Sequence, residues 1–373
     1  MNERLEVLEA STGKIIREMP LSAVGEPGRE WSLGNLLAFN SGGDLLAIAG
    51  KNLLKLNLDG GAHAVLADDL MKATTLACDA VGNIYIFDLA PDRKNIRVYS
   101  ASGKFLRTIG TPGGYRAGPW DPQRFNDITG LGIDSAGHLW AVDWTYWPKR
   151  ISQWTTDGKH LKDFFGPTAY GGGGALDPWD KRRLFYGPLE FELDWQTGKT
   201  RLKNLTWTGA TRAGDIPIRV QRRDYLVTSF NVHGPEQPYG AVYLHTGDQL
   251  KLVAAVGQAN GFEPLQNKRL LAELGTPVLA NFKFIWTDRN GDGVVQANEI
   301  ALTPKPADMF GVTPFQRDLS VQAGRVRWVV KEFLPNGVPV YEEQNVEALA
   351  GKGRQFVRLD NGNFHRLGGG ERQ

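Results

Sequence analysis

Two stretches of the chain, DAVGNIYIFD (residues 79–88) and DSAGHLWAVD (residues 134–143), align without a gap at an offset of 55. The alignment continues to Gly103 and Gly158, each followed by lysine in a second turn. An earlier stretch, NSGGDLLAIA (residues 40–49), matches the first of them at an offset of 39. The chain therefore contains an internal repeat, and a repeat of this length decides the fold.

Each copy reads as an apolar strand, a turn of the form D-x-x-G, an alternating strand, a variable loop and a final hairpin. Four short strands per copy are typical of a propeller blade. Weaker copies follow at residues 182–205, 222–257 and 319–343. The pattern predicts an all-β chain, with residues 1–373 forming a single β-propeller of six blades. The alternative is a β-sandwich, which the shared register at two offsets disfavours.

The copies resemble NHL-type repeats, whose sheets form the blades of closed β-propellers. The resemblance covers most of residues 4–257 and is specific from Asp79 to Gly110 and from Asp134 to Gly166. Arg150 occupies the basic position that these repeats often carry before the third strand, whereas the preceding copy has Asn95 there. Residues 165–178 and 286–299 also resemble segments of large exported bacterial NHL proteins. The resemblance implies a secreted, periplasmic or cell-surface location, within a larger assembly.

Residues 4–19 match the outer hairpin of a copy without the inner strands. In a closed propeller the missing strands would come from the C-terminal part, about residues 319–367, which hides the sheet edges. The alternative is that the sequence is a piece of a longer protein. It shows no signal peptide at its N-terminus.

Composition excludes some classes of function. The 43 basic and 41 acidic residues leave a net charge of +2, which gives no electrostatic reason to expect nucleic acid as a partner. The sequence has no apolar run long enough for a membrane span. Cys78 is the only cysteine, so no disulfide forms within the chain.

The most specific motif is DRNGDGVVQANE (residues 288–299), which fits the twelve-residue calcium loop. Ca²⁺ prefers hard oxygen ligands, which the motif offers at the required spacing. The expected ligands are Asp288, Asn290, Asp292, the Val294 carbonyl, Gln296 through water, and Glu299. We expect this loop within an insertion at residues 258–310, preceded by a strand instead of a helix. A turn without metal is the alternative.

A second candidate is the loop DWTYWPKR (residues 143–150), which replaces the small, charged loop of the preceding copy. Trp144, Tyr146 and Trp147, with Arg150 beside them, would suit a carbohydrate or another ligand that contains a ring. The alternative is that these aromatic side chains only cap the end of a blade.

No motif of nucleophilic or metal-dependent catalysis appears in the sequence. Asp88 and Asp143 recur at one blade position, where we expect them to accept hydrogen bonds from backbone N–H groups between blades. The sequence thus predicts a calcium-stabilised binding or scaffold module, with carbohydrate or protein as the partner. The alternative is a carbohydrate-active enzyme, a lyase or hydrolase. Paired carboxylates, or a His/Arg/Tyr cluster beside a pocket, would favour the enzyme.

Overall fold

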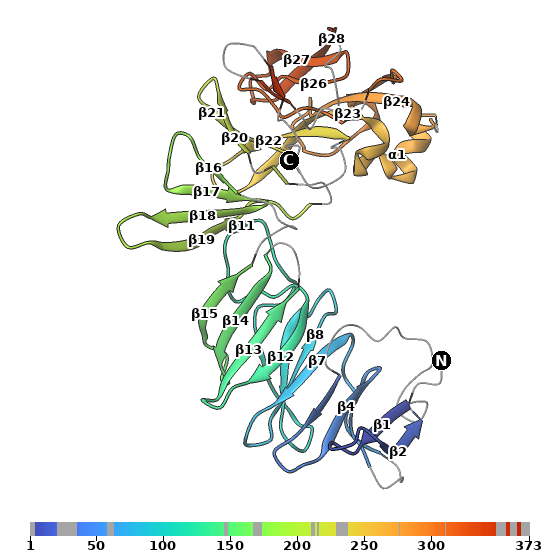
Figure 1. The fold of residues 1–373 in the computed structure, drawn as a ribbon, viewed down its shortest axis with the longest axis vertical. Helices are drawn as coiled ribbons and strands as arrows, with labels where there is room; N and C mark the ends of the chain where they lie inside the picture. The colour runs from blue at the N-terminus through green and yellow to red at the C-terminus, as the bar shows by residue number, and fades with distance from the viewer. Residues whose placement is uncertain are drawn as a thin grey trace, which may run out of the picture. The chain divides into compact units, whose positions relative to one another are not determined.

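The structure is a computed structural model. It describes residues 4–20, 36–57, 63–144, 148–166, 174–209, 213–214, 216–228, 238–275, 277–309, 311–347, 356–358 and 364–366. The chain divides into two compact units (Figure 1). Unit 1 comprises Met1–Tyr115 and Asp121–Pro167, and unit 2 comprises Arg116–Trp120 and Thr168–Gln373.

Unit 1 consists of antiparallel sheets in which consecutive strands are neighbours. Its first sheet has two strands, β1 (Arg4–Leu8) and β2 (Ile15–Pro20). Three four-stranded sheets follow. They contain β3 (Leu37–Phe39), β4 (Leu45–Ala49), β5 (Asn52–Lys55) and β6 (Ala64–Ala67); β7 (Ala73–Cys78), β8 (Ile84–Asp88), β9 (Asn95–Tyr99) and β10 (Phe105–Ile109); and β12 (Ile128–Ile133), β13 (His138–Asp143), β14 (Arg150–Thr155) and β15 (His160–Phe165).

The repeated turn at the start of each copy has the same hydrogen bonds in both aligned copies. Asp79 accepts through Oδ1 from the backbone N–H of Asn83 at 2.8 Å, and Asp134 accepts likewise from His138 at 2.8 Å. Their second oxygens accept from Tyr85 at 3.0 Å and from Trp140 at 2.8 Å. A short polar side chain that satisfies its own turn fixes the hairpin between the first two strands. The offset of 55 is therefore structural, and it also relates β7 to β12.

Neighbouring four-stranded sheets of unit 1 pack through large apolar side chains. Tyr85 and Phe87 of β8 share a buried cluster with Leu139 and Trp154 of the next sheet. The innermost strands β7 and β12 also meet, because the Thr74 hydroxyl donates to the Ile128 carbonyl at 2.6 Å. Four-stranded antiparallel sheets that pack in this way fit the blades of a β-propeller.

Asp88 and Asp143 have the structural role that their repetition predicts. Asp88 accepts from the backbone N–H groups of Met71 and Lys72 at 3.0 and 2.9 Å, in the connection that enters its own sheet. Asp143 accepts from the N–H groups of Asn126 and Asp127 at 2.8 and 3.1 Å. Each aspartate thus fixes the chain as it arrives from the preceding sheet.

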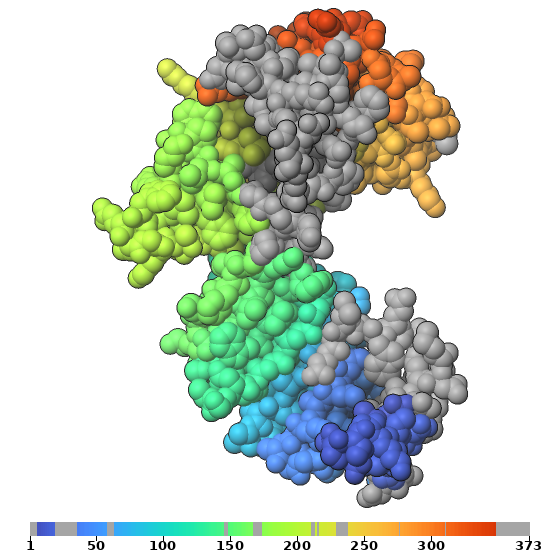
Figure 2. Space-filling model, in the orientation of Figure 1, coloured from blue at the N-terminus to red at the C-terminus, as the bar shows by residue number. Residues whose placement is uncertain are grey.

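Unit 2 departs from the four-stranded pattern. Among the described residues its sheets have five, six and three strands, and a further pair, β29 (Phe356–Arg358) and β30 (Phe364–Arg366), forms a two-stranded sheet. The three larger sheets contain β11 (Gly118–Pro119), β16 (Ala175–Leu176), β17 (Arg183–Tyr186), β18 (Leu189–Asp194) and β19 (Lys199–Leu205); β20 (Ile216–Val220), β21 (Arg223–Val227), β22 (Tyr239–His245), β23 (Leu250–Gln258), β24 (Phe282–Thr287) and β25 (Ile300–Pro304); and β26 (Val321–Ala323), β27 (Val326–Phe333) and β28 (Pro339–Asn345). Figure 2 shows the turn between β18 and β19 on the surface, in yellow-green.

The expected insertion at residues 258–310 has two parts. Residues 259–281 carry short 3₁₀ helices, Ala259–Gly261, Glu263–Gln266 and Leu279–Asn281, and the α-helix α1 (Lys268–Glu273). β24 and β25 then extend the six-stranded sheet, joined by a loop that ends in the 3₁₀ turn Ala297–Glu299. The described part of the chain is thus almost wholly β, which confirms the predicted class. Within it, no helix is long and apolar enough to cross a membrane.

Candidate functional site

The predicted aromatic loop is described in part. Trp144 directly follows β13, and its side chain is 55% exposed. The Lys149 ammonium lies 6.0 Å from the centroid of its ring. Tyr146 and Trp147 lie outside the described residues. Trp144 is thus accessible to a ligand, and the roles of Tyr146 and Trp147 stay predictions.

Arg150 lies in the interior of unit 1, at 1% exposure. Its Nε donates to Asp163 at 2.7 Å, Nη1 donates to the Arg124 carbonyl at 2.8 Å, and Nη2 donates to the Pro122 carbonyl at 2.7 Å. A buried guanidinium satisfied in this way holds β14, β15 and the segment before β12 together. In this arrangement Arg150 has a structural role, and its contact with a ligand stays a prediction.

The predicted calcium loop connects β24 to β25, so a strand precedes it, as expected. Gly291 and Gly293 adopt positive φ angles of 76° and 74°, which turn the chain sharply and favour glycine. The motif thus forms a compact loop at one end of a β-hairpin in unit 2.

Two acidic side chains of this loop point inward. Asp288 is fully buried; its Oδ2 accepts from the Gly293 N–H at 3.1 Å, and its Oδ1 has no hydrogen-bond partner. Glu299 is 7% exposed, and its Oε1 accepts from the backbone N–H of Arg289 at 2.8 Å. The Trp286 indole donates to Glu299 Oε2 at 3.3 Å. A buried carboxylate oxygen without a partner is costly unless a proton donor or a cation satisfies it.

The other predicted ligands face one another on the outer side of the loop. Asp292 accepts through Oδ2 from Asn290 at 2.9 Å and from Gln296 at 2.7 Å, and through Oδ1 from the Val294 N–H at 2.7 Å. Among the described residues, no three His, Cys, Asp or Glu side chains converge as metal ligands. Lys251 places a positive charge beside the loop, with Nζ 3.8 Å from Asp288 Oδ2. The donor set therefore has the oxygen chemistry of Ca²⁺, although its members are not gathered around one point.

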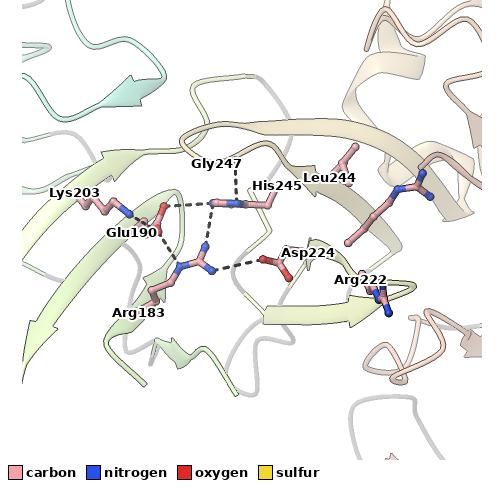
Figure 3. Close-up of a pocket in the computed structure, with 9 residues that line it drawn as sticks. Arg183, Glu190, Lys203, Arg222, Asp224, Leu244, His245 and Gly247 are labelled. Carbon is pink, nitrogen blue, oxygen red and sulfur yellow. Dashed lines mark hydrogen bonds and ion pairs between the residues drawn. The ribbon is translucent and has the colours of Figure 1, made fainter. Parts of the chain in front are cut away.

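Unit 2 also contains a polar pocket of about 550 Å³ that the sequence analysis did not find (Figure 3). Its basic side chains come from β17, β19 and the β20–β21 hairpin: Arg183, Lys203, Arg222 and Arg223. The remaining lining residues are Glu190, Asp224, Leu244, His245 and Gly247. Leaving His245 aside, four basic and two acidic residues give an excess of two positive charges.

The base of this pocket is a paired network around Arg183. Its Nε donates to Glu190 Oε1 at 3.0 Å, and its Nη1 donates to Asp177 at 2.9 Å. Asp224 Oδ2 lies 3.7 Å from the same Nη1. Figure 3 shows Arg183 between Glu190 and Asp224, with His245 next to Glu190. Arg183 therefore holds the acidic side chains in place, and its own guanidinium is already paired with them.

His245 is held at both ring nitrogens. Gly247 donates its backbone N–H to Nδ1 at 3.3 Å, while Nε2 lies 3.3 Å from Glu190 Oε2 and 3.4 Å from Arg183 Nη2. Burial raises the pKa of Glu190, but hydrogen bonds from His245 and Asn204 and the charge of Arg183 outweigh burial and lower it to about 2. Burial also raises the pKa of Asp224, but its hydrogen bond with Arg219 and the charges of Arg219 and Arg183 together outweigh burial and lower it.

This arrangement disfavours acid–base catalysis, although it brings a histidine, an arginine and two carboxylates together beside a pocket. General acids need a proton near neutral pH, which carboxyl groups with depressed pKa values lack. Both ring nitrogens of His245 already lie in polar contacts, with the Gly247 N–H on one side and with Glu190 and Arg183 on the other. The cluster is better suited to holding charge in place than to moving a proton.

One turn lies beside both the calcium loop and the pocket. The β27–β28 turn closes with the Gly337 N–H donating to the Leu334 carbonyl at 2.8 Å. Arg223 donates through Nη2 to the Pro335 carbonyl at 2.7 Å. On the other side, a Cβ built at Gly291 would lie 3.1 Å from Asn336 Nδ2. The turn is thus in contact with a residue of each site.

Comparison with known proteins leaves the family open. No family model matches the chain, and no curated protein matches it. Among solved structures, a chain of a nidogen/laminin complex is similar at 16% identity and a TM-score of 0.26, covering 54% of this chain and 70% of that chain. Dihydro-heme d1 dehydrogenase NirN in complex with DHE is similar at 10% identity and a TM-score of 0.30, covering 94% and 72%. Similarity at this level does not establish the fold, so the fold assignment depends on the observed sheets and their packing.

Proposed function

We propose that this chain is a non-catalytic binding or scaffold module of propeller type, stabilised by Ca²⁺ in the β24–β25 loop. The observation that supports calcium is Asp288, a fully buried carboxylate with one oxygen that has no hydrogen-bond partner. It occupies the first position of a twelve-residue calcium motif. Ca²⁺ would compensate that charge and that oxygen together.

The residues that would hold the ion are Asp288, Asn290, Asp292, the Val294 carbonyl, Gln296 and Glu299. Their carboxylate, amide and carbonyl oxygens are the ligand types that Ca²⁺ prefers. Bound there, Ca²⁺ would supply positive charge and order. The chain's own contribution is the fixed hairpin, in which Trp286 orients Glu299 and Gly293 orients Asp288. Extracellular calcium exceeds cytosolic calcium, so the motif also favours the exported location, within a larger assembly.

Calorimetric titration of the metal-free protein with CaCl₂, together with melting curves in calcium and in EDTA, tests this proposal. Calcium at 100 times its dissociation constant should add about 2.7 kcal/mol of stability. Asp288→Asn should abolish binding, whereas Asp308→Asn, which removes an exposed carboxylate paired with Arg325, should leave it unchanged. No binding to the folded protein, with equal melting temperatures in calcium and EDTA, would contradict the proposal.

A carbohydrate partner is supported by the exposure of Trp144, because a stacked aromatic ring contributes about 0.5–1.5 kcal/mol beyond its buried area. Trp144→Ala should weaken binding to the polysaccharide that the unmodified protein prefers in a calorimetric panel. A matched Trp195→Ala variant removes another exposed tryptophan, on the β18–β19 turn, and should bind as before. Equal binding by all three proteins would leave a protein partner as the alternative, and cleavage of a polysaccharide would favour the lyase or hydrolase.

A further inference from the structure

We propose that the pocket of unit 2 binds the oxyanion group of a small ligand, that is, a carboxylate, sulfate or phosphate. Its volume of about 550 Å³ is that of a small-molecule site. The site is separate from the calcium loop, because none of the expected calcium ligands lines the pocket. The argument rests on which of its charged groups are already paired and which are not.

The acidic groups of the pocket are neutralised from within. Glu190 is fully buried, accepts from Arg183, and also accepts from Asn204 at 2.7 Å. Asp224 accepts from Arg219 through Oδ1 at 2.5 Å. These carboxylates have fixed cationic partners, so they repel an incoming anion less than free carboxylates would. Their pairing also uses Arg183, which leaves the other cations to contact a ligand.

Arg222 is the most available of these cations. It is exposed and has neither an ion pair nor a hydrogen bond with the rest of the described chain. Arg222 and Gln221 form the two-residue turn between β20 and β21 with φ angles of 64° and 50°. Such a turn favours glycine or asparagine, and larger side chains there carry strain. A strained arginine at the edge of a pocket is a sign of a functional constraint.

Two further basic residues extend the site. Lys203 Nζ lies 3.9 Å from Glu190 Oε1, beyond hydrogen-bond distance, with its side chain 43% exposed. Arg223 donates to the Pro335 carbonyl and has no carboxylate partner among the described residues. Figure 3 shows Lys203 and Arg222 on opposite sides of the paired network. A group with several negatively charged oxygens could contact cations on both sides, whereas a neutral sugar would not compensate their charge.

The test is a calorimetric titration of the whole chain with sodium sulfate, with sodium phosphate, and with trigalacturonate, using neutral maltotriose for comparison. Binding of the inorganic anions alone assigns the site to a free anion. Binding of trigalacturonate alone, or more tightly than the inorganic anions, assigns it to an acidic saccharide. Affinity should fall as NaCl is raised, because the contacts are between exposed charges.

Arg222→Asn is the key variant, because asparagine tolerates the left-handed backbone while the charge is removed. It should lower the affinity for the bound anion at least about tenfold, and Lys203→Met should lower it several-fold. Arg269→Gln is the control, because it removes an arginine on α1 that is 91% exposed. This variant should bind the anion as tightly as the unmodified protein does. Unchanged melting temperatures would show that the variants are folded.

Two results would overturn the proposal. One is the absence of binding by all three anions. The other is equal loss of affinity in Arg222→Asn and Arg269→Gln, which would show that only the net charge of the surface matters. Neither result bears on calcium, since the six expected loop ligands, Asp288 among them, are unchanged in these variants.

Discussion

Glu190 shows how one buried residue ties the stability of unit 2 to pH. Its pKa is lowered from 4.5 to about 2 in the folded chain, so folding favours its charged form. The stabilisation is fully present above about pH 5 and is lost as the pH falls toward 2; a shift of this size corresponds to about 3 kcal/mol. We therefore expect Glu190 to make the free energy of unfolding of unit 2 decrease as the pH is lowered.

The corresponding prediction concerns Glu190→Gln, which cannot titrate. The urea midpoint of the unmodified protein should fall more steeply between pH 5 and pH 2.5 than that of the variant. Asp134, whose pKa is also lowered to about 2, remains in both proteins, so its contribution is common to the two curves. Parallel curves for the two proteins would show that Glu190 is not the group responsible.

At the level of residues, the sequence predicts sites that are local and misses those that are not. The calcium motif is found because its expected ligands lie within one twelve-residue stretch. The pocket escapes sequence reasoning because Arg183, Glu190 and His245 lie on three strands, at positions with no common spacing. Arg150 shows a third case. Its basic character is visible in the sequence, but only the packing of β14 shows that it is buried.

Strand hairpins of unit 1 are positioned by equivalent glycines at their outer turns. Gly13, Gly103 and Gly158 have φ angles of 68°, 83° and 101°. Their surroundings differ. A Cβ at Gly103 would lie 2.0 Å from the Leu66 carbonyl oxygen of β6, and one at Gly158 would lie 3.1 Å from Ile109 Cγ1 of β10, whereas nothing lies within 4 Å at Gly13. The outer turns at Gly103 and Gly158 therefore each rest against the outer strand of the sheet before them, and the turn at Gly13 does not.

This difference predicts a graded series of alanine variants. Gly13→Ala should cost about 1 kcal/mol, the usual penalty of a positive φ. Gly103→Ala should cost about 2 kcal/mol more, because a backbone atom cannot move aside as a side chain can, and Gly158→Ala should fall between them. Urea denaturation of the three variants measures the order. Equal losses would mean that the turns do not press on the neighbouring sheets.

At the level of elements, the sequence is most informative where the repeat is regular. The offset of 55 places β12 at Ile128–Ile133 from β7 at Ala73–Cys78. In unit 2, loops of unequal length interrupt the repeat, and the sheets have five, six and three strands. β24 and β25 illustrate the reason. They extend the sheet beyond β23, but the alternation of apolar residues in a strand does not specify which sheet that strand joins.

At the scale of the whole molecule, the described strands support the predicted class, while ring closure stays a prediction. β1 and β2 form the expected hairpin at residues 4–20. Their sharing of a blade with strands from residues 319–367, and the total of six blades, depend on how separate parts of the chain assemble. Ring closure and the number of blades are determined by contacts between sheets that are distant in sequence. An internal repeat predicts the strands of each sheet, but it does not predict these contacts.

The β27–β28 turn has a consequence for the two proposed sites taken together. Through Asn336 it lies against Gly291 of the calcium loop, and through Pro335 it holds Arg223 of the pocket. If calcium shifts this turn, the two equilibria are thermodynamically linked, and the factor by which Ca²⁺ changes the anion's affinity must equal the factor by which the anion changes the affinity for Ca²⁺. Titrating each ligand with and without the other measures both factors. A common value different from one would make the pocket a reporter of calcium, so that an acidic ligand would be held or released according to the ion concentration around the protein.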